Sequence, residues 1–408
     1  MVSTKRTFIA TAVLLATATL TPLALAQQTI KIGALNPYSG PMALYGTEVT
    51  RGYELATEKV NSSGGIQGRK LELIRGDVTN AQQGIATVEQ LVNKDKVDMF
   101  VGTYVSGISL TASDTALRYN KLYWETNAVA QALTDRKLPN FIRSGPDGSA
   151  FANTSSAAVR DLIAPALKKE IKDLKIWIEH EESIYGTSIA QGQKRILEAF
   201  GAKVVGVGSH AASTISLNDT VLRAKKAEPD VLIQTGYVPD GNLLLRTMRD
   251  QGFKPAAVLF VGTGDTPETL QALGAASMEG ILVVGYPRND ITDKFGPGNK
   301  AYLDAYRAKF KADPVAPQGM AAYSGFLIMA EALKAAGSVD PAKVQAAAAK
   351  LNVPENTYPS GFGAKFDGTF QNVRAQFTAS QWQDGKMVTV FPKDAVLPGV
   401  KLRPLARP

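Results

Sequence analysis

The chain has 408 residues, of which 45% are hydrophobic and 20% are charged, so it can bury two cores of ordinary domain size, about 100 to 200 residues each. It has no cysteine and only two histidines, which argues against disulfides, thiol chemistry and a histidine-rich metal site. The net charge of +8 is not gathered into a Lys/Arg block, so nucleic-acid binding is not supported. We expect no metal and no cofactor.

The first residues form an export signal. Lys5 and Arg6 precede an apolar run at 8–20, and residues 24–26, Ala-Leu-Ala, form an A-x-A cleavage site. We therefore expect residues 1–26 to be a signal peptide, cleaved after Ala26, and the mature protein to lie in the periplasm. No later window offers about 18 consecutive apolar residues, so no membrane-spanning helix is expected in the mature chain.

In the first half of the mature chain, short apolar runs alternate with amphipathic windows, a pattern typical of a parallel sheet covered by helices. In chain order, we predict a strand at 29–35, a helix at 46–60, a strand at 70–75, a helix at 82–93, a strand at 97–101, a helix at 107–119 and a strand at 121–124. No hairpin joins these four strands. They predict a doubly wound sheet, whose ligands bind beyond the carboxyl ends of the strands.

A second series of the same kind follows residues 145–148. We predict a helix to about 167, a strand at 175–179, a helix at 187–200, and strands at 203–207, 231–234, 257–261 and 280–284. Helical windows at 299–310, 319–336 and 341–351 come next, then strands at 374–378 and 386–391. This helical block is too short for a third core, so we expect it to return to one of the two sheets.

Three segments rich in Gly and Pro are candidate crossings between two lobes, at 144–148, 285–289 and 358–363. Three such connections would form a hinge; the alternative is that they are ordinary surface loops. With these crossings, the N-terminal lobe comprises residues 27–146 and 287–358. The C-terminal lobe comprises residues 147–286 and 359–408.

Motifs for catalysis are missing from the sequence. It has no G-x-S-x-G elbow, no Walker A loop and no H-E-x-x-H. The run from Glu179 through His180 to Glu182 looks like an acid/base cluster, but a charge run after a strand is more typical of a solvated loop. We therefore expect that the protein is not an enzyme.

Two segments carry a family resemblance. Residues 36–46 read Asn-Pro-Tyr-Ser-Gly-Pro-Met-Ala-Leu-Tyr-Gly, and residues 64–71 read Gly-Gly-Ile-Gln-Gly-Arg-Lys-Leu. They resemble the SGP-x-A-x-YG loop and the GGI-x-G turn of periplasmic solute-binding proteins from branched-chain amino acid ABC transporters. The resemblance continues at 101–106, 185–186, 236–239 and 280–283. It implies an α/β, type I periplasmic-binding-protein fold: two doubly wound parallel-sheet lobes, joined by a three-segment hinge, that grip a ligand between them.

The same resemblance implies partners and a binding site. The closed form would dock on ABC permease subunits in the inner membrane, and the protein would be a monomer. Ser106 falls where a family serine holds the ligand carboxylate, and its place before a helix agrees with an anion site; a plain N-cap is the alternative. Our candidate ligand-binding residues are Tyr45, Tyr104, Ser106, Asn127, Ala128, Val129, Tyr185, Tyr237 and Asp265.

Two departures from the family leave the ligand open. Val129 stands where the family has a carboxylate-binding threonine, and its side chain cannot donate a hydrogen bond. Gly264 stands at the acidic position that pairs with the ligand ammonium, with Asp265 beside it. If Asp265 faces the cleft, a hydrophobic or branched-chain amino acid is expected. If it points away, an aromatic or aliphatic acid without an amino group is expected, because an unpaired buried ammonium costs several kcal/mol. A ligand sensor of the same fold is the other alternative.

Overall fold

The computed structural model describes Met1 and residues 29–406. The predicted signal peptide, apart from Met1, and its cleavage after Ala26 lie outside the described residues. Within the described part of the chain, no helix combines the length and the apolar character needed to cross a membrane.

The first half of the described chain forms a parallel five-stranded sheet in the order β2-β1-β3-β4-β5. Its strands are β1 (Ile30–Asn36), β2 (Leu71–Asp77), β3 (Met99–Gly102), β4 (Tyr123–Glu125) and β5 (Phe141–Arg143). Four of these strands match the predicted ones within a few residues. Strand β5 is not predicted from the sequence, because three residues are too few to show a periodic pattern.

Helices cover both faces of this sheet because alternate strand residues point to opposite sides. In β3, Met99 and Val101 pack with α1 and α13, whereas Phe100 packs with α2 and α3. The helices of this region are α1 (Ala43–Ser62), α2 (Ala81–Gln90), α3 (Ser106–Arg118), α4 (Ala132–Asp135), α12 (Asn299–Phe310), α13 (Gln318–Ala336) and α14 (Pro341–Ala348).

The second sheet has seven strands in the order β12-β11-β10-β9-β8-β6-β7. They are β6 (Lys175–Glu181), β7 (Lys203–His210), β8 (Val231–Thr235), β9 (Ala257–Val261), β10 (Leu282–Gly285), β11 (Thr378–Gln383) and β12 (Lys386–Phe391). Strands β6 to β10 are parallel, as predicted. The last two strands, β11 and β12, join the sheet antiparallel.

Helices also cover the second sheet on both faces. Ile176 and Ile178 of β6 belong to the cluster that includes Ile189 of α7, whereas Trp177 packs with Val221 of α8. The helices of this region are α5 (Gly148–Ala158), α6 (Ala164–Ala166), α7 (Ile184–Ala199), α8 (Asn218–Lys226), α9 (Val238–Asp250), α10 (Pro267–Leu273) and α11 (Ala275–Met278). Short 3₁₀ turns lie at Gly40–Met42 and Ile171–Asp173, and π-helical turns at Leu91–Asp95 and Val159–Ile163.

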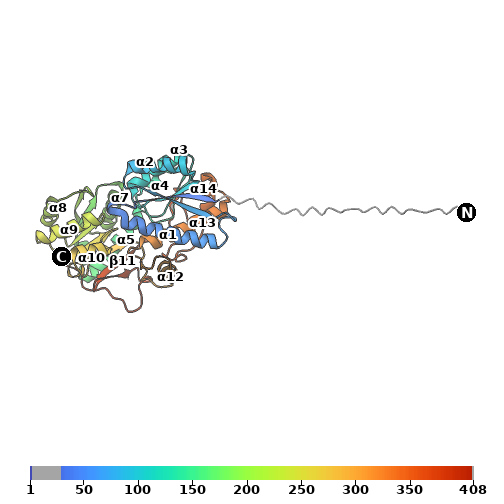
Figure 1. The fold of residues 1–408 in the computed structure, drawn as a ribbon. Helices are drawn as coiled ribbons and strands as arrows, with labels where there is room; N and C mark the ends of the chain where they lie inside the picture. The colour runs from blue at the N-terminus through green and yellow to red at the C-terminus, as the bar shows by residue number, and fades with distance from the viewer. Residues whose placement is uncertain (2–28, 407–408) are drawn as a thin grey trace.

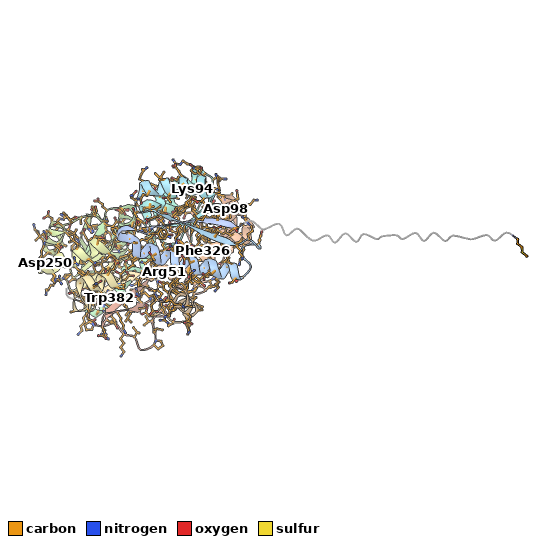
Figure 2. All side chains as sticks on the ribbon, viewed as in Figure 1. Arg51, Lys94, Asp98, Asp250, Phe326 and Trp382 are labelled. Carbon is orange, nitrogen blue, oxygen red and sulfur yellow. The ribbon has the colours of Figure 1, made fainter. Side chains whose placement is uncertain are left out.

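The late helical block returns to the first sheet. In Figure 1, the orange helix α13 lies beside the blue helix α1, although more than 250 residues separate them in sequence, and α14 packs against α13. Phe326 of α13 is fully buried, and its ring centroid lies 5.6 Å from that of Tyr53 in α1. Figure 2 places Phe326 in this part of the molecule and Trp382, from β11, in the other.

The chain stays in contact with the first sheet beyond the third crossing predicted at 358–363. Residues after 363 still contact the first sheet: the backbone of Gln371 pairs with that of Arg143 in β5, and the Gln371 side chain accepts a hydrogen bond from the Arg143 Nε. The chain enters the second sheet only at Thr378. The predicted strand at 374–378 is therefore shifted to β11. Its residues are all buried, so they lack the alternation of a half-exposed strand.

Candidate ligand-binding site

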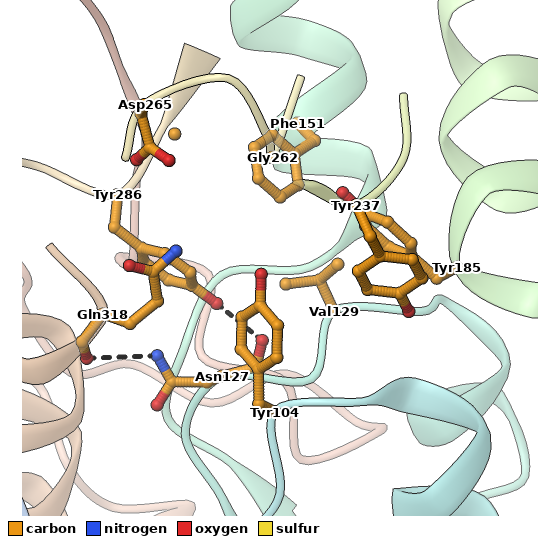
Figure 3. Close-up of a pocket in the computed structure, with 11 residues that line it drawn as sticks. Tyr104, Asn127, Val129, Phe151, Tyr185, Tyr237, Gly262, Asp265, Tyr286 and Gln318 are labelled. Atoms are coloured by element: carbon orange, nitrogen blue, oxygen red, sulfur yellow. Dashed lines mark hydrogen bonds between the residues drawn. The ribbon is translucent and has the colours of Figure 1, made fainter. Parts of the chain in front are cut away.

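A pocket lies between the two sheets, where the carboxyl ends of β3, β4, β9 and β10 meet the N-terminal ends of helices (Figure 3). The space between its walls is about 380 Å³, a volume that includes open solvent. Parallel α/β sheets place their ligands at this edge. The pocket is lined by Tyr104, Asn127, Val129, Phe151, Tyr185, Tyr237, Gly262, Asp265, Gly285, Tyr286 and Gln318.

Five of the eleven residues that line the pocket are aromatic. Figure 3 shows Tyr104 standing near the middle of the view, between Tyr286 on one side and Tyr185 and Tyr237 on the other. The Tyr185 and Tyr237 ring centroids are 5.3 Å apart. Burial raises the pKa of Tyr104, Tyr185, Tyr237 and Tyr286 well above the ordinary phenol value. The phenols therefore stay neutral, and the wall suits an apolar or aromatic group.

Local helix and turn geometry places the tyrosines. Ser183 caps α7 by accepting a hydrogen bond from the Tyr185 backbone N–H at 3.2 Å, so Tyr185 sits in the first turn. Tyr237 precedes α9, and Asp240 accepts its N–H at 2.8 Å. Gly262 has φ +72°, and a Cβ there would lie 2.0 Å from the Tyr185 Oη. Only glycine leaves room for this ring.

Asp265 faces the pocket. It is 5% exposed, and its side-chain contacts with other residues are both long: Tyr45 Oη lies 3.4 Å from Oδ1, and Arg288 Nη1 lies 3.6 Å from Oδ2. Burial raises the pKa of the Asp265 carboxyl, and Arg288 opposes this rise. A buried carboxylate with only long contacts has acceptor capacity left for a cationic group of a ligand.

The loop after β4, residues 126–130, is held from several sides and is called the ligand loop below. The side chain of Glu125 accepts the N–H groups of 126, 127 and 128, and Ser106 Oγ accepts the N–H of Ala130 at 3.1 Å. Tyr286 Oη donates to the Asn127 carbonyl at 2.6 Å (Figure 3). Within residues 29–406, the Val129 N–H has no acceptor, and Val129 lines the pocket.

The structure brings together most, but not all, of the residues predicted to bind the ligand. The predicted residues that line the pocket are Tyr104, Asn127, Val129, Tyr185, Tyr237 and Asp265. Tyr45, Ser106 and Ala128 are not among the lining residues. Tyr45 lies behind Tyr104, with ring centroids 4.8 Å apart, and reaches Asp265. Ser106 Oγ accepts a hydrogen bond from the Ala130 N–H, and the Ala128 carbonyl accepts one from Arg143.

Five lining residues are not among the predicted ligand-binding residues: Phe151, Gly262, Gly285, Tyr286 and Gln318. Gly262, Gly285 and Tyr286 directly follow or end strands that the sequence predicts, so position at a strand end was a usable signal. Phe151 and Gln318 lie on α5 and α13. Nothing in the sequence indicates which surface of these helices meets the pocket.

Metal binding finds no support in the geometry. Within residues 29–406, no three His, Asp or Glu side chains are grouped so that they could hold a metal ion. The buried cluster around His210 consists of one imidazole between Glu179 and Asp240, at 2.8 and 3.0 Å. That arrangement is a hydrogen-bonded ion-pair network.

Comparison with known proteins decides the family. Residues 29–386 match the family described as periplasmic binding protein. The chain belongs to this family. The "Leu/Ile/Val-binding protein homolog 7" of Brucella suis is 36% identical over 374 residues, which cover 91% of this chain and 94% of that protein. The resemblance seen in the sequence is therefore confirmed, and the family is one of solute-binding proteins rather than enzymes.

Solved structures of periplasmic binding proteins share the fold. The branched-chain amino acid transporter substrate binding protein LivJ from Streptococcus pneumoniae, solved with isoleucine, superposes with a TM-score of 0.72 at 22% identity, covering 89% of this chain and 100% of that one. A solute binding protein from R. palustris, solved with 4-hydroxybenzoate, gives 0.74 at 23% identity, covering 89% and 95%. The type I periplasmic-binding-protein fold predicted from the sequence is thus confirmed.

Proposed function

We propose that this periplasmic binding protein is the solute-binding component of an ABC importer and that its ligand is an α-amino acid with an apolar or aromatic side chain. The observation that carries the ligand class is Asp265, a buried carboxylate on the pocket wall with only long contacts to Tyr45 and Arg288. An ammonium group at this position would supply the short, charge-assisted hydrogen bonds that the carboxylate lacks.

The other groups of an α-amino acid also find partners. Its carboxylate would accept a hydrogen bond from the unpaired Val129 N–H. This N–H lies beside the N-terminus of α3, where backbone N–H groups and the helix dipole favour an anion. Its side chain would lie among the rings of Tyr104, Tyr185 and Tyr237. The name of the Brucella suis relative and the isoleucine bound to LivJ support this ligand class.

The mechanism is closure of two lobes on the ligand. The N-terminal lobe would comprise residues 27–146 and 287 to about 376, because Phe370 and Asn372 still form backbone hydrogen bonds with Arg143 of the first sheet. The C-terminal lobe would comprise 147–286 and the chain from Thr378 onward. Tyr286, in the second crossing, lines the pocket and bonds to Asn127. The ligand gains contacts from both lobes only when they close, so its binding favours the closed form.

An acid without an amino group is the second candidate. Arg288 already lies beside Asp265, and five of the eleven lining residues are aromatic. If this guanidinium moved to the ligand side of Asp265, it would pair with a ligand carboxylate. The R. palustris protein with 4-hydroxybenzoate supports such a ligand.

Export and transport complete the proposal. The signal peptide at 1–26 would be cleaved after Ala26, and the mature protein would act as a monomer that docks on ABC permease subunits in the inner membrane. The family places such proteins in the periplasm.

A thermal-shift screen tests the proposal. Mature protein, unfolded and refolded to remove bound ligand, is heated with single α-amino acids, their 2-oxo analogues and aromatic acids. A ligand present at about 100 times its dissociation constant adds about 2.7 kcal/mol of stability. We expect apolar or aromatic amino acids to raise the melting temperature. Stabilisation by aromatic acids alone would favour the second candidate, and stabilisation by neither class would overturn the proposal.

A further inference from the structure

Glu125 is a buried glutamate directly behind the pocket. It ends β4 and is fully buried, and its carboxylate gathers hydrogen bonds from both loops that border the pocket. From the loop after β3, Oε2 accepts the Thr103 N–H at 2.6 Å, and from α3 it accepts the Ser109 hydroxyl at 2.5 Å. From the ligand loop, Oε1 accepts three N–H groups, each at 2.9 Å: those of Thr126, Asn127 and Ala128.

Every one of these contacts donates to Glu125. An ionised carboxylate is acceptor-only and has about four lone-pair sites, so the set suits the charged form. A protonated carboxyl group would place an O–H among donors and would weaken its hydrogen bonds with at least one of the two loops. The three bonds to Oε1 also fix which N–H the ligand loop leaves unpaired, namely that of Val129.

Other polar groups surround this carboxylate, and one of them carries the opposite charge. Arg143 of β5 is fully buried and donates to the carbonyls of Ala128 and Ala130 at 3.1 and 2.8 Å, so it holds the ligand loop from its carbonyl side. The remaining groups that interact with Glu125 are phenols whose pKa is raised by burial and which stay neutral: Tyr53 of α1, Tyr123 of β4 and Tyr286 of the second crossing.

We propose that Glu125 is a positioning residue: in its ionised form it shapes the ligand loop so that the Val129 N–H is presented to the ligand, and ligand affinity therefore depends on pH. This inference rests on the proposed function, because it concerns the same pocket. Glu125 itself does not line the pocket and acts through the backbone of the ligand loop.

The pH range follows from burial. Burial raises the pKa of Glu125 from 4.5 to about 7, although the hydrogen bonds from Ala128, Ser109, Asn127 and Thr103 oppose this rise. Because the pKa of Glu125 is raised, ionising it in the folded protein lowers the free energy of unfolding. The full stability is present below pH 4.5, where the group is protonated, and this contribution is lost as the pH rises through about 7. The ionised form of Glu125 thus orders the ligand loop but lowers the stability of the whole fold. If only the ionised form presents Val129, the dissociation constant rises about tenfold from pH 8 to pH 6.

Three variants separate this role from simple packing. Glu125→Gln keeps the shape but cannot ionise. Ser109→Ala removes one donor from the carboxylate, which raises the pKa of Glu125 and moves the pH midpoint upward. Glu48→Gln is the matched control: Glu48 is fully buried in the same half of the molecule, burial raises its pKa, and it bonds to Tyr306 and Arg51 outside the pocket.

Two measurements on the mature protein are made at pH 6 and pH 8. The first is amide hydrogen exchange of peptides covering the ligand loop in ligand-free protein, corrected for the intrinsic effect of pH. We expect the wild type and Glu48→Gln to lose protection at pH 6, and Glu125→Gln to be weakly protected at both pH values. The second is calorimetric titration with L-leucine. The dissociation constant of the wild type and of Glu48→Gln should rise about tenfold from pH 8 to pH 6, and that of Glu125→Gln should not change with pH. Ser109→Ala should bind L-leucine more weakly than the wild type at pH 8, because less of its Glu125 is ionised there.

The outcomes separate the two proposals. Equal protection of the ligand loop at both pH values in the wild type would overturn the role of Glu125, as would a Glu125→Gln variant that behaves like the wild type. If L-leucine binds equally well at pH 6 and pH 8, the role of Glu125 fails and the proposed function stands. If L-leucine does not bind at pH 8 while exchange follows the expected pattern, the proposed ligand class fails and the effect of Glu125 on the loop stands.

Discussion

Arg288 Nη1 lies 3.6 Å from Asp265 Oδ2, and the same nitrogen donates to the Asp265 backbone carbonyl at 3.4 Å. The Arg288 side chain is 21% exposed, whereas that of Asp265 is 6% exposed. The cation is therefore better hydrated than the anion and can turn to solvent at lower cost. This asymmetry lets a ligand ammonium replace Arg288 as the partner of Asp265.

Asp265→Asn removes the charge that we assign to the ligand ammonium. We expect affinity for L-leucine to fall by about 2–5 kcal/mol, roughly 30-fold to several thousand-fold, because one member of a buried charge pair is lost. Calorimetric titration measures this change. Affinity for an acid without an amino group should not fall. An Asp265→Asn variant that binds L-leucine as tightly as the wild type would remove Asp265 from the site.

Arg288→Met removes the competing cation. We expect affinity for L-leucine to rise several-fold, because the ammonium no longer displaces a guanidinium from Asp265. The ligand-free variant should melt at a lower temperature than the wild type, since a buried carboxylate loses its charged partner. Arg246→Met, at an exposed position of α9, is the control and should change neither value. Weaker binding of L-leucine by Arg288→Met would show that Arg288 belongs to the ligand's own contacts.

Gly262→Ala tests the placement of Tyr185. The added Cβ would lie 2.0 Å from the Tyr185 Oη, so the ring must move out of the pocket wall, and we expect a clear loss of ligand affinity. Gly252→Ala is a matched control. Gly252 has a similar φ, +62°, but no atom within 4 Å of its added Cβ. It bears the backbone strain without the clash, so it should lower the melting temperature and leave the dissociation constant unchanged. Equal affinities in both variants would contradict the assigned wall.

His210 makes the stability of the second sheet depend on pH. Burial alone lowers the pKa of His210, but hydrogen bonds with Asp240 and Glu179 outweigh it and raise the pKa from 6.5 to about 9. The stability from the charged form is present below pH 6.5 and is lost as the pH rises through about 9. We expect the melting temperature of the wild type to fall from pH 8 to pH 10. His210→Gln should lack this fall and His180→Gln should keep it, so a fall of the same size in His210→Gln would assign it to other groups.

Strand positions were the most predictable feature of the fold. Strands such as β8 and β9 are buried along their whole length, and a continuous apolar run between turn residues reveals them. Their carboxyl ends then directed attention to Tyr237 and to the loop from Gly262 to Asp265. The three-residue strand β5 and the buried strand β11 lack such a pattern, so long-range pairing alone defines them.

The charge run at 179–182 shows why the burial of some residues could not be predicted. The sequence favoured a solvated loop, and this interpretation was wrong, because Glu179 and Glu181 are buried within β6. Glu179 is paired with His210, which comes from the neighbouring strand β7. The same reasoning applies to Phe151 and Gln318. Partners that lie far away in sequence decide whether a polar or helical residue is buried, and a local pattern does not contain them.

The most direct test of the proposed ligand class is a pair of calorimetric titrations of ligand-stripped wild-type protein. L-leucine and 4-methyl-2-oxopentanoate share a side chain and a carboxylate, and they differ at the α-carbon, where only L-leucine carries an ammonium. We expect L-leucine to bind more tightly by at least about 30-fold, the lower end of the value for a buried charge pair. Equal affinities, or tighter binding of the oxo acid, would show that Asp265 is not the partner of a ligand ammonium.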